Sequence, residues 1–195
     1  MYNEIEFICA GNNGRSPVAE AAGRKLAQEL GIEERIRIFS SGTTVDVEKL
    51  GDLRVALVPY IEATIRNGLL PADRAKKIDS DPVGVLDELI AIEERWRNRY
   101  IAESTGFDYT KHIRRQTVAL SGERLILPVD EANLKKTREI YDGSGHNPTI
   151  EVLPAFIGLD LNLHQVDVRD YEDYSALAEK VERAAKEAVL KTLES

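Results

Sequence analysis

The sequence predicts an α/β fold in three layers, with a central parallel sheet of about four strands and helices on both faces. Short apolar segments typical of strands alternate along the chain with longer segments of helical periodicity. This alternation is typical of parallel sheets, whose strands are joined by helices that cover both faces. The 195 residues fit one domain of roughly 150 residues plus an insertion, and 43% hydrophobic residues suffice for a sizeable core. We therefore expect residues 1–195 to form a single domain.

The first strand is expected at residues 4–9, Glu-Ile-Glu-Phe-Ile-Cys, followed by a loop at 10–15 whose glycines and asparagines indicate a positive φ. Ser16 as N-cap and Pro17 at the first helical position predict a helix that ends at Gly31. Its buried face carries apolar residues at intervals of four, namely Val18, Ala22, Leu26 and Leu30. A second strand is expected at 35–39, closed by a turn at 40–43.

The middle segment, 45–106, gives weaker signals and is expected to be an insertion. Residues 52–67 have helical character interrupted near Pro59, and 68–82 form a polar connection. A stronger helix is predicted at 83–101. One stripe of it carries Val85, Leu89, Ile92, Trp96 and Tyr100. This helix is expected to add to the core, with a cap or a dimer surface as the alternative.

The C-terminal half supplies the remaining elements. Strands are expected at 125–127 and 150–153, and Asp130 can cap a helix that runs to about Tyr141. A closing helix is predicted at 174–193. Its inward face carries Leu177, Val181, Ala184 and Ala188.

Composition excludes several classes of protein. Acidic residues exceed basic ones by 34 − 26 = 8, so the chain lacks the basic field expected of a nucleic-acid binder. No stretch approaches the roughly 20 apolar residues of a membrane span. Cys9 is the only cysteine, so disulfide and zinc frameworks are excluded, no metal is expected, and a reducing cytoplasm fits. Oligomeric state is left open.

One group of residues indicates a catalytic site. It consists of Cys9 at the end of a strand, a glycine-containing loop, Arg15 six positions after Cys9, and the start of a helix. Ligands of parallel sheets bind at the carboxyl ends of strands. The amides of such a loop can converge on an anion, and the following helix adds its positive end. The arginine fork matches two oxygens of a tetrahedral oxyanion. These dipoles favour a thiolate at Cys9, which suits nucleophilic attack on phosphorus. The alternative is a buried structural thiol beside an unrelated loop.

The segment from Phe7 to Glu20, F-I-C-A-G-N-N-G-R-S-P-V-A-E, resembles the phosphate loop of the low-molecular-weight protein tyrosine phosphatases, C-x-G-N-x-x-R-S-P-x-A-E. The arsenate reductases share that fold. Three further segments are similar to family motifs. They are Ser40–Thr43 (S-x-G-T), Lys111–Gln116 (H-x-A-R-Q) and Leu125–Leu134 (M-D-x-x-N-L). The resemblance covers 1–44 and 107–195 and does not extend to 45–106.

The resemblance implies a role for each residue of the motif. Cys9 would be the nucleophile and Arg15 the clamp on the phosphoryl group, and Ser16 would hydrogen-bond the thiolate and ease its departure. Asn12, Ser41 and His112 would hold the loop in its strained left-handed turn. The phosphate would be bound by the whole loop: Ala10, Gly11, Asn12, Asn13, Gly14 and Arg15. No organic or metal cofactor is implied.

The general acid is the least defined residue. The family carries an Asp-Pro pair on a loop before the last helix, whereas this chain has no proline between Val166 and Tyr174. Asp167 aligns best with that acid. Asp170 is the alternative, although it could instead cap the helix. Tyr171 lies near the same loop, but the family's pocket-lining aromatic residues have no clear counterparts.

The expected function is that of a cysteine-dependent phosphomonoester phosphatase, most simply a cytoplasmic protein tyrosine phosphatase. It would act through a phosphocysteine on a phosphorylated protein or a small aryl phosphate. One alternative is an arsenate reductase, which would need an external thiol because the chain has no second cysteine. Another is a phosphate or phosphoprotein binder that keeps the loop but has no working acid.

Overall fold

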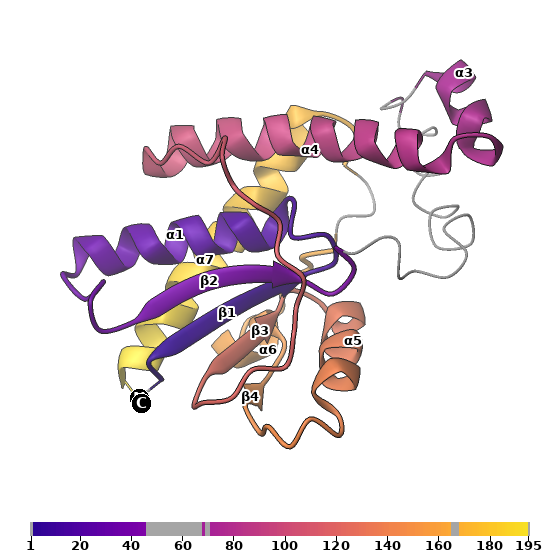
Figure 1. Cartoon of the computed structure of the whole chain (residues 1–195). Coiled ribbons are helices and arrows are strands. Elements are labelled where there is room, and N and C mark those ends of the chain that lie inside the picture. The colour runs from indigo at the N-terminus through magenta and orange to yellow at the C-terminus, as the bar shows by residue number, and fades with distance from the viewer. Residues whose placement is uncertain (1, 46–67, 69–70, 165–167, 195) are drawn as a thin grey trace.

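A computed structural model describes residues 2–45, 68, 71–164 and 168–194 (Figure 1). Its centre is a sheet of four parallel strands in the order β2-β1-β3-β4, which confirms the predicted fold class. The strands are β1 (Glu4–Cys9), β2 (Arg37–Gly42), β3 (Leu125–Pro128) and β4 (Thr149–Ile150). The chain leaves β1 toward β2 on one side and later returns to β3 on the other. The carboxyl end of β1 is therefore the switch point at which ligands of such sheets bind.

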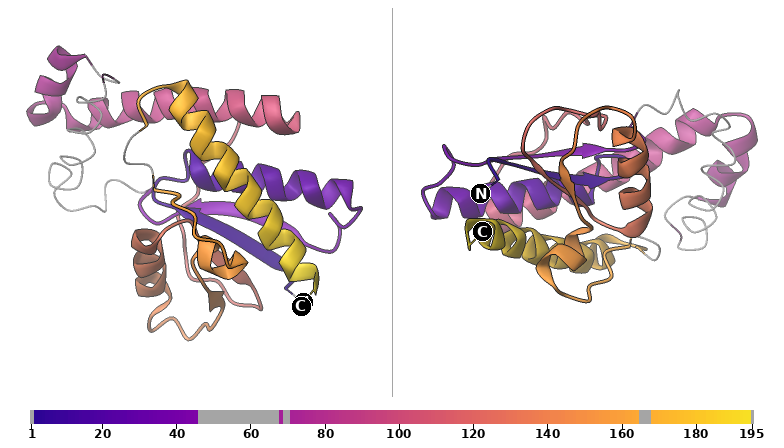
Figure 2. Two further views of the ribbon diagram at one scale, coloured as in Figure 1. Left: turned by 180° about the vertical axis from the view of Figure 1, so that it is seen from behind. Right: turned by 90° about the horizontal axis from the view of Figure 1, so that it is seen from below.

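Helices cover both faces of the sheet (Figures 1 and 2). Their bounds are α1 Arg15–Glu29, α3 Ala72–Ala75, the 3₁₀-helix η2 Lys76–Asp79, α4 Pro82–Thr105, α5 Glu131–Tyr141, α6 Leu153–Ile157 and α7 Tyr171–Glu194. The larger layer holds α1, α6 and α7, with α4 lying alongside α1, while α5 covers β1 and β3 from the opposite side.

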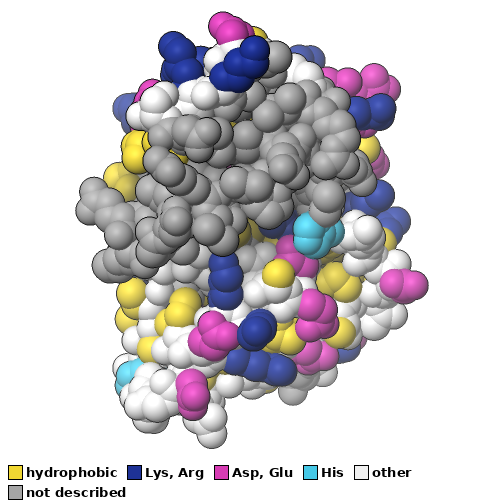
Figure 3. All heavy atoms as spheres, turned by 90° about the vertical axis from the view of Figure 1, so that its right-hand side faces the viewer, with side chains coloured by type: hydrophobic (Ala, Val, Ile, Leu, Met, Phe, Trp, Pro, Cys, Tyr) yellow, Lys and Arg dark blue, Asp and Glu magenta, His cyan; other side chains and the backbone are white. Residues whose placement is uncertain are grey.

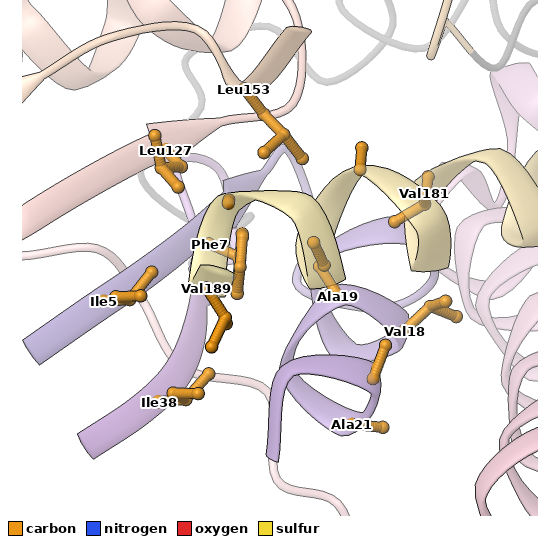
Figure 4. Packing of buried hydrophobic residues seen from close by; sticks show 14 of the residues in the cluster. Ile5, Phe7, Val18, Ala19, Ala21, Ile38, Leu127, Leu153, Val181 and Val189 are labelled. Atoms are coloured by element: carbon orange, nitrogen blue, oxygen red, sulfur yellow. The ribbon is translucent and has the colours of Figure 1, made fainter. Parts of the chain in front are cut away.

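The main core lies between the sheet, α1 and α7 (Figure 4). Alternate residues of β1, Ile5 and Phe7, point into it and are fully buried, as is Val181 of α7. Small residues let the two helices approach the sheet closely. A Cβ at Gly23 of α1 would lie 3.3 Å from Ile38 and 3.4 Å from Val189, so this position has little room for a side chain. The opposite face of the sheet has a smaller core around Ile8, Ile126 and Tyr141.

The predicted strand at 4–9, the Asp130 cap and the helix that follows it are confirmed. The closing helix is also confirmed, and all four of its predicted inward residues are buried. The long middle helix extends slightly beyond 83–101 at both ends. The predicted helix at 52–67 lies outside the described residues.

The strand expected at 150–153 is wrong in its bounds. Strand β4 is Thr149–Ile150, which pairs with β3 at two positions only, and Leu153 already begins α6, where a proline occupies the first turn. The connection expected at 68–82 contains α3 and η2.

Strand β2 and helix α1 also differ from the prediction. Strand β2 starts at Arg37 and not at residue 35. The turn expected at 40–43 is largely strand, since Gly42 exchanges backbone hydrogen bonds with Arg115 and Thr117 at 2.8 Å each. Helix α1 begins at Arg15, with Gly14 at the N-cap. Ser16 is thus not the cap, because its hydroxyl bonds Cys9 instead. Leu30 was expected on the buried face of α1 but is 45% exposed, since it lies beyond the end of the helix.

Candidate active site

The loop between β1 and α1 places its ends side by side. Cys9 is the last residue of β1, 3% exposed, and Arg15 is the first residue of α1. Ser16 Oγ lies 3.0 Å from Cys9 Sγ and donates a hydrogen bond to it. The first turn of α1 therefore lies next to the thiol.

Asn12 fixes the course of the loop. Its φ of 51° is the only positive value for a non-glycine residue in the described part of the chain, and the side chain is fully buried. Its amide nitrogen donates to Ser16 Oγ at 3.1 Å and to Ser40 Oγ at 2.8 Å, while Oδ1 accepts the backbone N–H of Arg115 at 2.8 Å. These bonds hold a left-handed conformation that asparagine tolerates better than most residues.

The hydroxyl that supports Asn12 comes from Ser40 and not from Ser41, which corrects the predicted network. Successive side chains of a strand point to opposite faces of the sheet. Ser40 therefore faces α1, where its hydroxyl also donates to Glu20 Oε2 at 2.7 Å. The Ser41 hydroxyl faces the other way and donates to Glu6 Oε1 at 2.5 Å. Ser41 does reach the loop through its carbonyl oxygen, which lies 3.2 Å from Ser16 Oγ and is a second acceptor for the single proton of that hydroxyl.

His112 lies against the outer side of the loop. Its Nε2 is 3.3 Å from both the carbonyl oxygen and Oδ1 of Asn12, so this nitrogen carries the proton and donates. The ring stacks on Tyr109 with centroids 5.6 Å apart. Burial, together with the positive charge of Arg97 and further arginines, lowers the pKa of His112 to about 4. The imidazole is thus neutral at pH 7, where it stabilises the loop without adding charge.

This lowered pKa predicts a pH-dependent stability. Between pH 6.5 and about 4 the unfolded chain binds a proton that the folded His112 excludes, so stability falls as pH decreases through this window. After allowance for solvent screening at a half-buried ring, the loss is about 1–2 kcal/mol. The free energy of unfolding in urea should therefore be lower at pH 4.5 than at pH 7 in wild type. The difference should be smaller in His112→Gln, because glutamine keeps a hydrogen-bond donor but does not titrate. The exposed His146→Gln is the matched control. Equal pH dependence in wild type and His112→Gln would contradict the prediction.

Arg15 is anchored from two sides. Its Nη1 donates to Asp130 Oδ2 at 2.6 Å and to the carbonyl of Leu163 at 3.0 Å. Burial alone would lower the pKa of Arg15, but Cys9 and Asp130 outweigh it and the pKa is raised. Its Nε is buried and finds no hydrogen-bond partner among the described residues.

Asp130 has two roles, of which the sequence suggested only one. Its Oδ1 caps α5 by accepting the backbone N–H of Asn133 at 2.9 Å. Its Oδ2 fixes Arg15. Burial would raise the pKa of Asp130, but the Arg15 charge and the hydrogen bonds from Asn133 lower it, so this carboxylate stays ionised. Its place in the motif-like segment Leu125–Leu134 was the available signal for the second role.

Asp167, the predicted general acid, lies outside the described residues. Asp170 is described, and it caps α7: its Oδ1 accepts the backbone N–H of Asp173 at 2.9 Å and its carbonyl accepts that of Tyr174 at 3.1 Å. Tyr171 turns toward the end of α4, where its hydroxyl donates to Glu103 Oε2 at 2.6 Å. The helix-capping alternative for Asp170 therefore fits the geometry.

The face onto which β1 and β2 point carries a mixture of charges. In Figure 3 the right-hand side of Figure 1 faces the viewer, and the described part of this face shows basic, acidic and apolar side chains interspersed. The described residues contain no cluster of three or more His, Cys, Asp or Glu placed to hold a metal ion. None of the described helices is long and apolar enough to cross a membrane.

Together the loop offers a nucleophile and an oxyanion cradle at one point. The thiol of Cys9 and the side chain of Arg15 are groups of the kind needed to attack a tetrahedral phosphoryl centre and to stabilise its charge.

Comparisons with known proteins agree with this chemistry. The model of the family described as low molecular weight phosphotyrosine protein phosphatase matches residues 4–124. The low molecular weight protein-tyrosine-phosphatase YfkJ of Bacillus subtilis is 29% identical over 115 residues, which cover 57% of this chain and 69% of that protein.

Solved structures show the same fold. Wzb of Vibrio vulnificus, in complex with benzylphosphonate, has a TM-score of 0.59 at 17% identity and covers 98% of this chain and 99% of its own. The low molecular weight protein tyrosine phosphatase of T. tengcongensis has a TM-score of 0.60 at 17% identity, and the match covers 96% of this chain and 98% of that protein. Because the family model matches well over half of the chain and includes the entire phosphate loop, the chain belongs to the low molecular weight phosphotyrosine protein phosphatase family.

Proposed function

We propose that this protein hydrolyses phosphomonoesters through a phosphocysteine formed on Cys9. The observation that carries the proposal is the buried thiol at the switch point of the sheet, 3.0 Å from the Ser16 hydroxyl and enclosed by the loop that Arg15 completes. Family membership supports the same chemistry.

The first step forms an S–P bond and breaks the bond between phosphorus and the leaving oxygen. The thiolate of Cys9 supplies the electron pair, and a general acid gives its proton to the leaving oxygen. We propose Asp167 for that acid. Arg15 and the loop amides stabilise the charge on the equatorial oxygens.

The second step returns the enzyme to its starting state. Water attacks phosphorus, the same carboxylate takes the water's proton, and the S–P bond breaks to give inorganic phosphate and the Cys9 thiolate. The Ser16 hydroxyl, which already donates to Sγ, stabilises the departing thiolate in this step.

For substrate we propose a phosphorylated protein, phosphotyrosine in particular, or a small aryl phosphate. The name of the Bacillus subtilis relative supports tyrosine as the phosphorylated residue. We infer that the protein works in the cytoplasm, because a catalytic thiol requires reducing conditions. We also infer that it acts as a single domain and that it binds neither nucleic acid nor membranes.

Turnover of p-nitrophenyl phosphate without added metal tests the proposal. Inorganic phosphate and vanadate should compete with the substrate, because both fit the oxyanion cradle. Phosphate binding without turnover would favour the non-catalytic binder. Arsenate-dependent consumption of an added thiol would favour the reductase.

The assignment of the acid predicts a dependence on the leaving group. Asp167→Asn should lower kcat strongly for phenyl phosphate and less for p-nitrophenyl phosphate, because an acid helps most where the leaving oxygen is most basic. The expected loss for phenyl phosphate is about 10²- to 10³-fold. Asp170→Asn is the matched control and should leave this dependence unchanged. If the selective loss occurs in Asp170→Asn instead, the acid is Asp170.

A further inference from the structure

Helix α4 brings two oppositely charged side chains onto the outside of the phosphate loop. Glu93 and Arg97 are four residues apart and therefore lie on the same face of the helix. Figure 1 shows α4 running beside α1, which begins where the loop ends. Neither residue belongs to the motif segments that resemble the family.

Arg97 holds the backbone of the loop. Its Nη1 donates to the carbonyl oxygen of Asn13 at 3.0 Å, and its Nη2 to that of Tyr109 at 3.4 Å. Only 1% of this residue is exposed, and the guanidinium is fixed further by Asn98 Oδ1 at 3.0 Å from Nε. Such a buried cation is costly unless its donors are used, so its position is well determined.

The direction of that carbonyl decides the direction of the next amide. The described peptide bonds are all trans, and in a trans peptide C=O and N–H point to opposite sides. With the Asn13 carbonyl bonded to Arg97 on α4, the N–H of Gly14 is directed away from Arg97. An amide that faces away from α4 is available to an oxyanion on the other side of the loop.

Glu93 fixes the neighbouring side chain and fills the space beside Gly14. Its Oε2 accepts a hydrogen bond from Asn13 Nδ2 at 2.6 Å, and that nitrogen also lies 3.3 Å from the carbonyl of Ile90. A Cβ at Gly14 would lie 2.9 Å from the carboxyl carbon of Glu93, closer than real Cβ contacts. The carboxylate thus occupies the place of a side chain at this position of the loop.

We propose that Glu93 and Arg97 are positioning residues of the active site, which hold the peptide between Asn13 and Gly14 with its N–H directed at the oxyanion. The inference rests on the proposed function, because it assigns these residues to the same loop. It predicts that losing either contact harms stabilisation of the transition state more than binding of the substrate.

Arg97→Met tests the backbone contact. We expect kcat to fall about 10- to 100-fold with a smaller change in KM, because a misplaced amide loses stabilisation in the transition state. Vanadate should lose more affinity than phosphate, since it can adopt the geometry of the transition state. Arg97→Lys, which keeps one donor, should recover part of kcat. Arg95→Met is the matched control, because Arg95 lies exposed on the same helix and should leave both inhibitors unchanged.

Glu93→Gln and Glu93→Ala test the contact between Glu93 and the Asn13 side chain. If Arg97→Met does not fold, these two variants still test whether α4 positions the loop. Glutamine keeps an acceptor for Asn13 and should stay within about 3-fold of wild type in kcat, whereas alanine should lose about 10-fold. Asp87→Asn, on an exposed part of α4, controls for the charge. All constants are measured at a temperature where circular dichroism shows each variant folded.

Two outcomes would overturn the inference. One is an Arg97→Met variant that is folded and keeps both kcat and vanadate affinity. The other is equal loss in Glu93→Gln and Glu93→Ala. The affinity for phosphate, measured by calorimetry, separates this inference from the proposed function. If wild type binds phosphate without turnover, weaker binding by Arg97→Met would still support positioning while the phosphatase proposal fails. A wild type that neither turns over nor binds phosphate would overturn both.

Discussion

Replacing Cys9 with serine should abolish turnover and leave oxyanion binding in place. Serine removes the thiolate but keeps the loop, because the Asn12 network and Arg15 do not depend on sulfur. Loss of a nucleophile costs on the order of 10⁴-fold or more in kcat. Phosphate should still bind Cys9→Ser, since the loop amides and the Arg15 guanidinium remain.

Two measurements check this expectation. Steady-state hydrolysis of p-nitrophenyl phosphate gives the loss of kcat, and calorimetric titration with phosphate gives the retained affinity. A thiol-alkylating agent should inactivate wild type, with phosphate protecting it, because Cys9 is the only sulfhydryl in the chain. Full activity in Cys9→Ser would exclude the phosphocysteine mechanism.

Replacing Arg15 with lysine should lower kcat/KM by at least about 100-fold, on the scale of one lost transition-state donor. Lysine keeps the charge but not the planar fork. The fork lets Arg15 bond Asp130 and Leu163 with one nitrogen, and in the proposed mechanism its other nitrogens are left to bond the oxyanion. A lysine ammonium group has a single nitrogen, so it could not bond Asp130 and the phosphoryl oxygens from separate positions as the guanidinium does.

The matched control for Arg15→Lys is Arg138→Lys, the same substitution on the exposed face of α5. Its kinetics should equal those of wild type. The affinity for vanadate shows whether the geometry of the guanidinium or only its charge matters. If Arg15 acted through its charge alone, Arg15→Lys would bind vanadate almost as tightly as wild type. Near-normal kinetics in this variant would reject the role of the guanidinium fork.

Local signals in the sequence determined the parts of the molecule that depend on neighbours along the chain. The strand at 4–9, the glycine-rich loop and the helix that follows lie within about 30 consecutive residues, and alternation, φ preference and Pro17 are properties of those residues alone. The Asp130 cap and the inward face of α7 were predictable for the same reason. The position of Cys9 and Arg15 at the two ends of one loop follows directly from this segment.

Tertiary structure alone decided which distant side chains complete the site. Arg15 meets Asp130 across 115 residues, and Asn13 meets Glu93 and Arg97 across 80 and 84. Ser40, and not Ser41, supports Asn12 because the register of β2 against β1 sets which hydroxyl faces α1. Periodicity identifies the buried face of an element, but not the element that it meets. That pairing depends on the path of the whole chain, so these contacts leave no local signal in the sequence.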